Sequence, residues 1–413
     1  MASTSAYLVP GVSMPTGPVT TALLQQFHQL WNVQSQHHRN PCAQPMSLER
    51  AHISRLYTEE YVVADKTDGV RYSLFLTTVQ CRPYAVLIDR KLSIFQIPVA
   101  GNKKTFHGSI FDGELVWQKT KDVLTQVFLI FDVIAYKGCA KIQHENYHAR
   151  LAVIRNAFDL DGEIVSSPED AHALAKKNKI ICGGNAAGLS FQPKGCFPMN
   201  QLDTLLRKLT SLPYATDGLV FTPVQSPVET GTSQGVFKFK QNHTLDLEVR
   251  YDSENKPALF VGAGGNPQTA TQRLPLNSLG WNFTLSPADF WTRIDALQSR
   301  MTDKFQPLII ECKLLVKDTG LALEFMAIRG DKLHPNAVRT VLATVKNVQE
   351  NISLHELVEP LRSGFAQSTD AAASVKPASI PQPHSCRVAD HGGATLASIV
   401  VGDSLDSRHI LVD

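Results

Sequence analysis

The sequence predicts an α+β fold in which antiparallel sheets carry helices on their outer faces. Segments rich in β-branched and aromatic residues follow one another at hairpin spacing between Tyr61 and Tyr136. Two segments with the apolar spacing of helices, residues 145–158 and 199–209, come later in the chain. With 413 residues, of which 43% are hydrophobic, the chain can fill two cores. We therefore expect two packed units, both rich in β-structure.

The expected elements divide between a first unit at residues 21–241 and a second unit at residues 242–363. In the first unit, strands are expected at residues 61–65, 72–79, 84–89, 93–97 and 125–136. In the second unit, strands are expected at residues 245–251, 257–261, 308–316 and 321–328, and helices at residues 288–301 and 337–350. Residues 1–20, rich in Ser, Thr, Pro and Gly, are expected to be flexible, and the low-complexity residues 364–413 to be disordered.

Composition argues against several classes of protein. Lysine and arginine total 40 against 38 for aspartate and glutamate, a net charge of +2, so any attraction for a polyanion must come from a local cleft. The 7 cysteines form no C-x-x-C pair, which favours reduced thiols over a disulfide frame or a zinc site. We find no secretory signal, and the longest apolar runs are too short to span a bilayer. We expect a soluble protein that does not bind a membrane.

Lys66 is the most informative residue because it opens a K-x-D-G-x-R pattern that ends at Arg71. The pattern places an amine nucleophile just before a tight Asp68-Gly69 turn, with a fixed cation shortly after it. An amine attacks phosphorus only when it is unprotonated, and its ordinary pKa is about 10.4, so more positive charge is required nearby. A purely structural turn gives the same pattern, so the motif alone leaves both interpretations open.

Further segments that combine strands, cations and acids follow in a specific order. They are VLIDR at residues 86–90, IFDGELV at 110–116, FLIFD at 128–132, DGLVF at 217–221, FKFK at 237–240 and RGDKLHPN at 329–336. At these segments the chain closely resembles the messenger RNA guanylyltransferases, the GTP-dependent capping enzymes. They belong to the covalent nucleotidyltransferase superfamily, which also holds the ATP-dependent DNA and RNA ligases. The resemblance covers residues 57–361, and the R-x-D-K-x-x-P-N form of the last segment favours capping enzymes over ligases.

The resemblance implies a nucleotidyltransferase domain of antiparallel sheets with flanking helices, followed by an oligonucleotide-binding-type barrel. It also implies a reaction in two steps. Lys66 attacks the α-phosphorus of GTP, expels pyrophosphate and holds GMP through a phosphoramidate, and the GMP then passes to the 5′-diphosphate end of RNA. Mg²⁺ or Mn²⁺ and several cations would be directed at the charged phosphoryl oxygens.

Carried over position by position, the resemblance assigns a role to each of a set of residues. The catalytic set is Lys66, Lys238, Lys240, Arg329, Asp331 and Lys332. The GTP-binding set is Thr67, Arg71, Arg90, Glu114, Phe128, Lys194 and Asp217, and the candidate metal ligands are Asp217 and Asp246. Phe128 would stack on the purine and Lys194 would read the guanine O6. A core phenylalanine and a surface lysine are the ordinary alternatives for these two residues.

Two other functions stay open at this point. An ATP-dependent polynucleotide ligase would share most of these residues and carry AMP, and a non-catalytic RNA-binding scaffold would have lost Lys66 or the motif lysines. The sequence shows no phosphatase loop and no methyltransferase signature. We therefore expect a separate RNA triphosphatase and a separate cap (guanine-N7) methyltransferase as partners, with RNA polymerase as a further candidate. The expected location is the nucleus of a eukaryotic cell, or else the viral transcription site in an infected cell.

Overall fold

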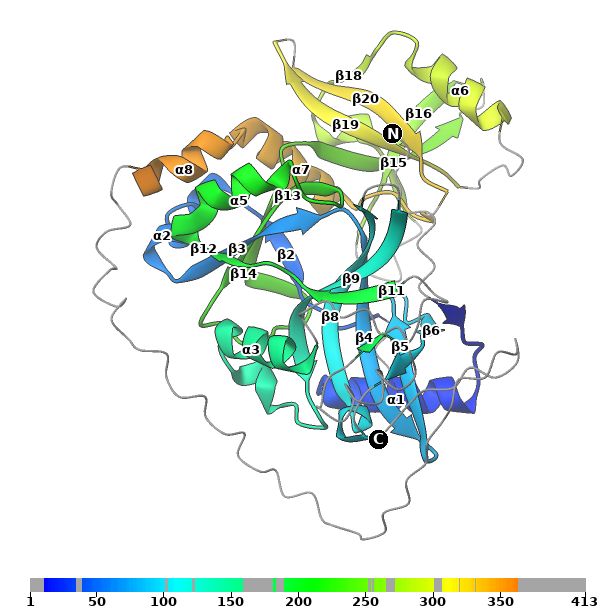
Figure 1. Cartoon of the computed structure of the whole chain (residues 1–413). Helices are drawn as coiled ribbons and strands as arrows, with labels where there is room; N and C mark the ends of the chain where they lie inside the picture. The colour runs from blue at the N-terminus through cyan, green and yellow to red at the C-terminus, as the bar shows by residue number, and fades with distance from the viewer. Residues whose placement is uncertain are drawn as a thin grey trace. The chain divides into compact units, whose positions relative to one another are not determined.

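The chain forms two compact units, and Figure 1 labels most of their helices and strands. The computed structural model describes residues 11–34, 39–100, 103–120, 123–158, 181–182, 189–251, 254, 256–264, 272–300, 307–318, 320–330 and 332–362. Among these, the larger unit holds residues 11–46 and Leu56–Lys238, and the smaller unit holds Ser47–Arg55 and Phe239–Arg362. Both units combine mostly antiparallel sheets with a few helices, so the α+β prediction is confirmed. The domain boundary expected after residue 241 stays a prediction.

A seven-stranded sheet dominates the described part of the larger unit, in the order β1-β6-β5-β4-β8-β9-β11. Its strands are β1 (Val12–Ser13), β4 (Val70–Val79), β5 (Arg82–Ile88), β6 (Ile94–Gln96), β8 (Ser109–Thr120), β9 (Val123–Ala135) and β11 (Leu189–Pro193). All neighbours are antiparallel except β11, which runs parallel to β9. Side chains alternate between the two faces of β4, with Leu74 and Leu76 in one apolar cluster and Phe75 in another.

A five-stranded sheet of the same unit follows the order β12-β3-β13-β14-β2 among the described residues. Its strands are β2 (Gln44–Ser47), β3 (Tyr61–Thr67), β12 (Phe197–Pro198), β13 (Thr216–Pro223) and β14 (Thr232–Phe239). A separate pair consists of β7 (Val99–Ala100) and β10 (Ile181–Cys182). Only Asp68 and Gly69 separate β3 from β4, so this connection joins the two large sheets.

Helices supply apolar side chains to both faces of the seven-stranded sheet. From α1 (Pro18–Leu30), Phe27 packs edge-to-face on Phe75, with ring centroids 5.7 Å apart. From α3 (Tyr147–Ala157), Ile154 joins the cluster on the opposite face. The remaining helical segments of this unit are α2 (Arg55–Thr58), η3 (Lys103–Phe106), η4 (Lys141–His144), η5 (Met199–Gln201) and α5 (Leu202–Leu209).

The expectation that residues 1–20 are flexible is wrong for the described residues 11–20. Strand β1 pairs with β6, and helix α1 begins at Pro18, where a fixed φ and a missing N–H suit the first turn. The same helix buries Leu23 completely in the core. Burial of such apolar side chains offsets the entropy of ordering this segment.

The described part of the smaller unit contains a six-stranded sheet in the order β17-β16-β15-β19-β20-β18. Its strands are β15 (His243–Tyr251), β16 (Pro257–Gly262), β17 (Arg273–Pro275), β18 (Phe283–Ser286), β19 (Leu308–Lys317) and β20 (Gly320–Ile328). Apolar residues of α6 (Phe290–Arg300) and α7 (Val338–Glu350), such as Ile294 and Val345, pack on this sheet. No strand pair within the described ranges closes the sheet on itself, so the expected barrel stays a prediction.

Ser47–Arg55, expected in the first domain, belongs to the smaller unit because polar contacts fasten it to α7. The amide of Asn347 donates a hydrogen bond to the Leu48 carbonyl at 3.0 Å, and the Arg50 N–H donates to Glu350 Oε2 at 2.7 Å. This segment includes η2 (Arg50–His52), and the unit ends with α8 (Leu354–Arg362). None of the helices in the described ranges has the length and apolar character needed to span a membrane.

Candidate active site

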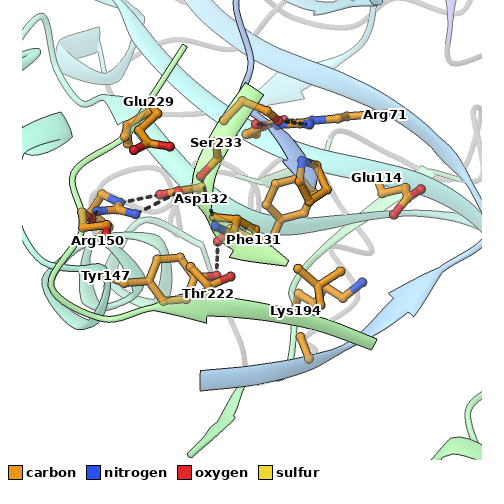
Figure 2. Close-up of a pocket in the computed structure, with 18 of the residues that line it drawn as sticks. Arg71, Glu114, Phe131, Asp132, Tyr147, Arg150, Lys194, Thr222, Glu229 and Ser233 are labelled. Atoms are coloured by element: carbon orange, nitrogen blue, oxygen red, sulfur yellow. Dashed lines mark hydrogen bonds and ion pairs between the residues drawn. The ribbon is translucent and has the colours of Figure 1, made fainter. Parts of the chain in front are cut away.

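A pocket of about 180 Å³ lies between the two large sheets of the larger unit (Figure 2). Strands β3, β13 and β14 supply one wall, and β4, β8 and β9 supply the other, so residues far apart in sequence meet there. Of the predicted site residues, those that line the pocket are Lys66, Thr67, Arg71, Arg90, Glu114 and Lys194.

Lys66 lies near the end of β3 and directs its amine to Asp217 of the adjacent strand β13. The Lys66 Nζ donates a hydrogen bond to Asp217 Oδ1 at 2.8 Å. Gly218 pairs with Lys66, and a register shift between Thr216 and Gly218 places Asp217 at a bulge. The φ angle of Gly218 is 153°, which favours glycine. This Asp-Gly pair therefore directs a carboxylate toward Lys66 from within a strand.

The Asp68-Gly69 connection fixes the position of Glu114. The backbone N–H of Gly69 donates to Glu114 Oε1 at 3.3 Å, and the Thr67 hydroxyl donates to the other carboxylate oxygen. A Cβ atom on Gly69 would lie 2.4 Å from the Leu115 carbonyl oxygen, so the two chains approach this closely only with glycine. Asp68-Gly69 thus connects the two sheets, and it orients the carboxylate of Glu114 in the pocket.

Arg71 is fixed on the opposite wall. Its Nε donates to Asp112 Oδ1 at 3.0 Å, and a second guanidinium nitrogen donates to the other Asp112 oxygen. The guanidinium carbon of Arg71 lies 5.4 Å from the Phe131 ring centroid. Such a bidentate pair holds a cation in one orientation. Arg90 is exposed at the pocket edge, yet desolvation of its guanidinium and then the charge of Arg71 lower the pKa of Arg90.

Lys194 is buried, with 7% of its surface exposed, so the ordinary alternative of a surface lysine does not apply. Its Nζ donates to Thr67 Oγ1 at 2.7 Å and lies 3.4 Å from Asp65 Oδ2. Because Thr67 in turn donates to Glu114, these contacts link Lys194 to Glu114 through one hydroxyl. The pocket lining therefore includes a buried cation held by two polar side chains.

The prediction that Phe128 stacks on the purine is wrong, because this side chain is 0% exposed and belongs to the apolar core. Its ring packs edge-to-face on Phe191, and a Cβ on Gly113 would come within 2.5 Å of it. Phe131, further along β9, lines the pocket instead. An odd separation along a strand places two side chains on opposite faces. In the view of Figure 2 the Phe131 ring lies in the middle of the pocket, between Arg71 and Lys194.

Strand β14 alternates as predicted. Phe237 and Phe239 are buried, Lys238 is half-buried, and so is Lys240, which follows the last residue of β14. Val236 lines the pocket, and period two puts Lys238 on the same face of the strand. Lys238 is the last residue of the larger unit, and Lys240 belongs to the smaller unit.

An ion pair that the sequence did not predict, between Arg150 of α3 and Asp132 of β9, also lines the pocket. Arg150 Nε donates to Asp132 Oδ1 at 2.7 Å, and a second nitrogen donates to Oδ2 at 3.1 Å (Figure 2). Burial raises the pKa of Asp132, and the charge of Arg150 opposes this shift. Strand β9 ends its apolar run in this acid, but the sequence carries no signal that pairs it with an arginine of α3.

The smaller unit holds its own cation cluster around Asp246. Arg329 lies 3.2 Å from Asp246 Oδ1 and 3.3 Å from Glu311 Oε2, and Lys332 Nζ lies 3.6 Å from Asp246 Oδ2. The Asn336 amide oxygen accepts the Asp246 backbone N–H at 2.9 Å. The predicted Asp331 lies outside the described residues. The carboxylate expected as a metal ligand thus orients two of the predicted phosphate-binding cations.

The donor set suits a divalent ion that keeps most of its own water. In the described part of the chain, no cluster of three or more His, Cys, Asp or Glu residues could hold a metal. Mg²⁺ is commonly bound by one or two carboxylates together with substrate phosphates and water. Asp217, beside the amine of Lys66, is an oxygen donor in a suitable place for such an ion.

A lysine paired with a carboxylate between two antiparallel sheets, followed by a second β-unit, has the organisation of a nucleotidyltransferase. Residues 4–242 match the family described as mRNA capping enzyme, catalytic domain, and residues 233–358 match its C-terminal domain. The chain therefore belongs to the mRNA capping enzyme family, and the resemblance inferred from its sequence is confirmed.

Curated relatives carry the same family name. The mRNA-capping enzyme subunit alpha of Neurospora crassa is 26% identical over 355 residues, covering 77% of this chain and 83% of the relative. The protein of that name from Schizosaccharomyces pombe is 22% identical over 337 residues, covering 78% and 79%. Among solved structures, a mycobacterial DNA ligase D complexed with ATP and MES is 14% identical with a TM-score of 0.36, covering 70% of this chain and 96% of the ligase chain.

Proposed function

We propose that this chain transfers GMP from GTP to the 5′-diphosphate end of RNA through a covalent adduct on Lys66. The observation that carries the proposal is the amine of Lys66, 2.8 Å from Asp217, in a pocket that also holds Arg71 and Glu114. Membership of the capping family supports the choice of this reaction over others that use a lysine nucleophile.

In the first step, the Lys66 nitrogen forms a bond to the α-phosphorus of GTP, and the bond from that phosphorus to the bridging oxygen of pyrophosphate breaks. The amine must lose a proton, and Asp217 is the described acceptor nearest to it. In the second step, a terminal oxygen of the RNA diphosphate bonds to the same phosphorus, the bond from phosphorus to the Lys66 nitrogen breaks, and the amine takes up a proton. Mg²⁺ or Mn²⁺ bound beside Asp217 would neutralise the phosphate oxygens in both steps.

The nucleoside contacts follow from the pocket walls. Phe131, rather than Phe128, offers an aromatic face on which the purine would stack. Lys194 would donate to the guanine O6, and Glu114 and Arg71 would contact the ribose and the phosphates; their positions in the pocket support these roles. Thr67 would act indirectly because its hydroxyl contacts both Lys194 and Glu114.

Arg329 and Lys332 would act mainly in the first step, in which the GMP adduct forms. Arg329 and Lys332 are oriented by Asp246, and we assign them to the β- and γ-phosphates, which are present only until pyrophosphate leaves. We therefore assign Asp246 to positioning these cations and not to binding metal. Lys238 would contact the α-phosphate, because it lies on the same face of β14 as Val236. The family resemblance gives the same role to Lys240, which follows the end of β14.

The proposed partners follow from the chemistry. The enzyme would receive 5′-diphosphate RNA from a separate RNA triphosphatase and deliver its product to a separate guanine-N7 methyltransferase. The subunit names of the relatives support a shared assembly with other capping subunits. We place the reaction in the nucleus of a eukaryotic cell, or at the viral transcription site in an infected cell.

Labelling with α-³²P nucleotides tests the proposal. With Mg²⁺ or Mn²⁺, the protein should take label from GTP and little from ATP, and then release it to 5′-diphosphate RNA. A buried donor at O6 can reject the wrong purine by about 10⁴-fold when its partner is missing. Strong labelling from ATP with transfer to a 5′-monophosphate nick would overturn the proposal in favour of a ligase, and no labelling at all would favour the scaffold.

A further inference from the structure

Asp65 precedes the nucleophile on β3 and has an unusual environment for a buried acid. It is 3% exposed and lines the pocket. Its Oδ2 atom is fully buried and has no hydrogen-bond partner among the described residues, although Lys194 Nζ lies 3.4 Å away. A charged pair that served only to stabilise the fold would be expected to close to about 2.7–2.9 Å, so the open contact requires an explanation.

We propose that Asp65 reads the N1–H and the N2 amino group of guanine, beside the contact of Lys194 with O6. This inference rests on the proposed function and deepens it, since it names a second residue that selects the base. The geometry that carries it is one donor and one acceptor, side by side and buried at the same end of the pocket.

The two side chains complement the edge of guanine atom by atom. Guanine presents an acceptor at O6 and donors at N1 and N2, in that order along its edge. An ammonium group next to a carboxylate presents the opposite order, a donor followed by an acceptor. Adenine presents an amino group where guanine has O6 and a lone pair at N1, so it would face like groups at both positions. Each mismatch would leave a buried charged group without a partner.

The Tyr214 phenol is a neighbour of the Asp65 carboxylate. Burial raises the pKa of the Tyr214 phenol, and the charge of Asp65 and a hydrogen bond to it raise the pKa further. Oδ2 is left without a hydrogen-bond partner among the described residues, and a base would reach it once the side chains that cover it shift. Tyr214 itself is not among the residues that line the described pocket, which makes it a suitable control position.

The test compares GTP, ITP and XTP as donors for adduct formation by the full chain, in single turnover. Hypoxanthine lacks the N2 amino group, so the unaltered protein should use ITP about 10-fold less well than GTP or worse. Xanthine carries an oxygen at C2, so XTP should be used less well still. In the Asp65→Asn variant, an amide N–H can donate to that oxygen, and the preference should move from GTP toward XTP by about 100-fold or more.

Tyr214→Phe is the matched control, because it removes a neighbour of the carboxylate and leaves the donor and acceptor in place. It should keep the preference for GTP over XTP. An unchanged ratio of GTP to XTP in folded Asp65→Asn protein would overturn the inference, and so would equal use of ITP and GTP by the unaltered protein. If Asp65→Asn does not fold, the comparison of ITP with GTP in the unaltered protein tests the inference instead. Absence of any GMP adduct on the unaltered protein would overturn the proposed function, and this inference with it.

Discussion

Two phenylalanines of β9 should respond in opposite ways to replacement by alanine. Phe128 is completely buried in the core, and Phe131 lines the pocket. The ring of Phe128 packs on Phe191 and against the backbone at Gly113, so its removal leaves a cavity that rigid strands cannot fill. Phe128→Ala should therefore lower stability and leave the chemistry of the remaining folded protein intact.

The expected magnitudes separate the two variants clearly. Deleting a buried phenylalanine costs about 3–5 kcal/mol, which for a unit of this size lowers Tm by roughly 6–20 °C. Losing one aromatic face that stacks on a base costs about 1–3 kcal/mol by alanine substitution. Phe131→Ala should therefore lower kcat/KM for adduct formation by about 5- to 150-fold, with a much smaller change in Tm.

Differential scanning calorimetry and a titration of GTP in the adduct assay measure both quantities on the same preparations. Phe131→Tyr, which keeps the aromatic face, is the control and should retain most of the activity. The reasoning is refuted if Phe128→Ala loses GTP affinity at full stability, or if Phe131→Ala is the variant that loses stability.

Four further outcomes are expected. Lys332→Ala should slow adduct formation from GTP by on the order of 10²-fold while sparing transfer from preformed adduct, and equal damage in single-turnover assays of both steps would contradict this. Arg150→Met should lower stability by about 3–5 kcal/mol in a denaturant titration, because it leaves the Asp132 charge unpaired, and pairing it with Asp132→Leu should restore much of the loss. Burial raises the pKa of Cys42 to about 12, so at pH 9 iodoacetamide should modify the exposed Cys81 and spare Cys42. The Cys42 thiol ionises near pH 8.5 in the unfolded chain and only near pH 12 in the folded chain. Its contribution to the free energy of unfolding is therefore complete below about pH 8.5 and should fall as pH rises from there toward 12.

The ordered motifs predicted which residues would meet, because each motif joins a strand to a charged residue at its end or at a short connection. Lys66, Arg90 and Glu114 come from three separate segments and line one pocket, and Asp217 from a fourth contacts Lys66. The strands and helices of both units also lie close to where periodicity places them.

The choice between Phe128 and Phe131 could not come from the sequence. Phe128, Leu129 and Ile130 are all buried, so β9 is apolar on both faces there and alternation carries no information about which face borders the pocket. Register shifts where β8 pairs with β9 make it harder still to tell which residues of β9 share a face. The partner of Asp132 was likewise beyond prediction, since an ion pair between β9 and α3 depends on how the helix packs.

The order of residues 11–20 was missed for a different reason. Strand β1 has 2 residues and α1 begins only at Pro18, so this stretch is too short to show a period. Its composition of turn-forming residues resembles that of a flexible segment, and only the pairing with β6 and the burial of α1 set it apart.

The central claim is that the amine of Lys66 carries the transferred nucleotide. Peptide mass spectrometry of the protein, after incubation with GTP and Mg²⁺ and acid-free digestion, locates the adduct directly. We predict the mass of GMP on the peptide that contains Lys66, and its complete loss in folded Lys66→Ala protein, because no other side chain supplies this nitrogen. GMP on any other residue of the unaltered protein, or AMP in place of GMP when both nucleotides are offered, would contradict the account.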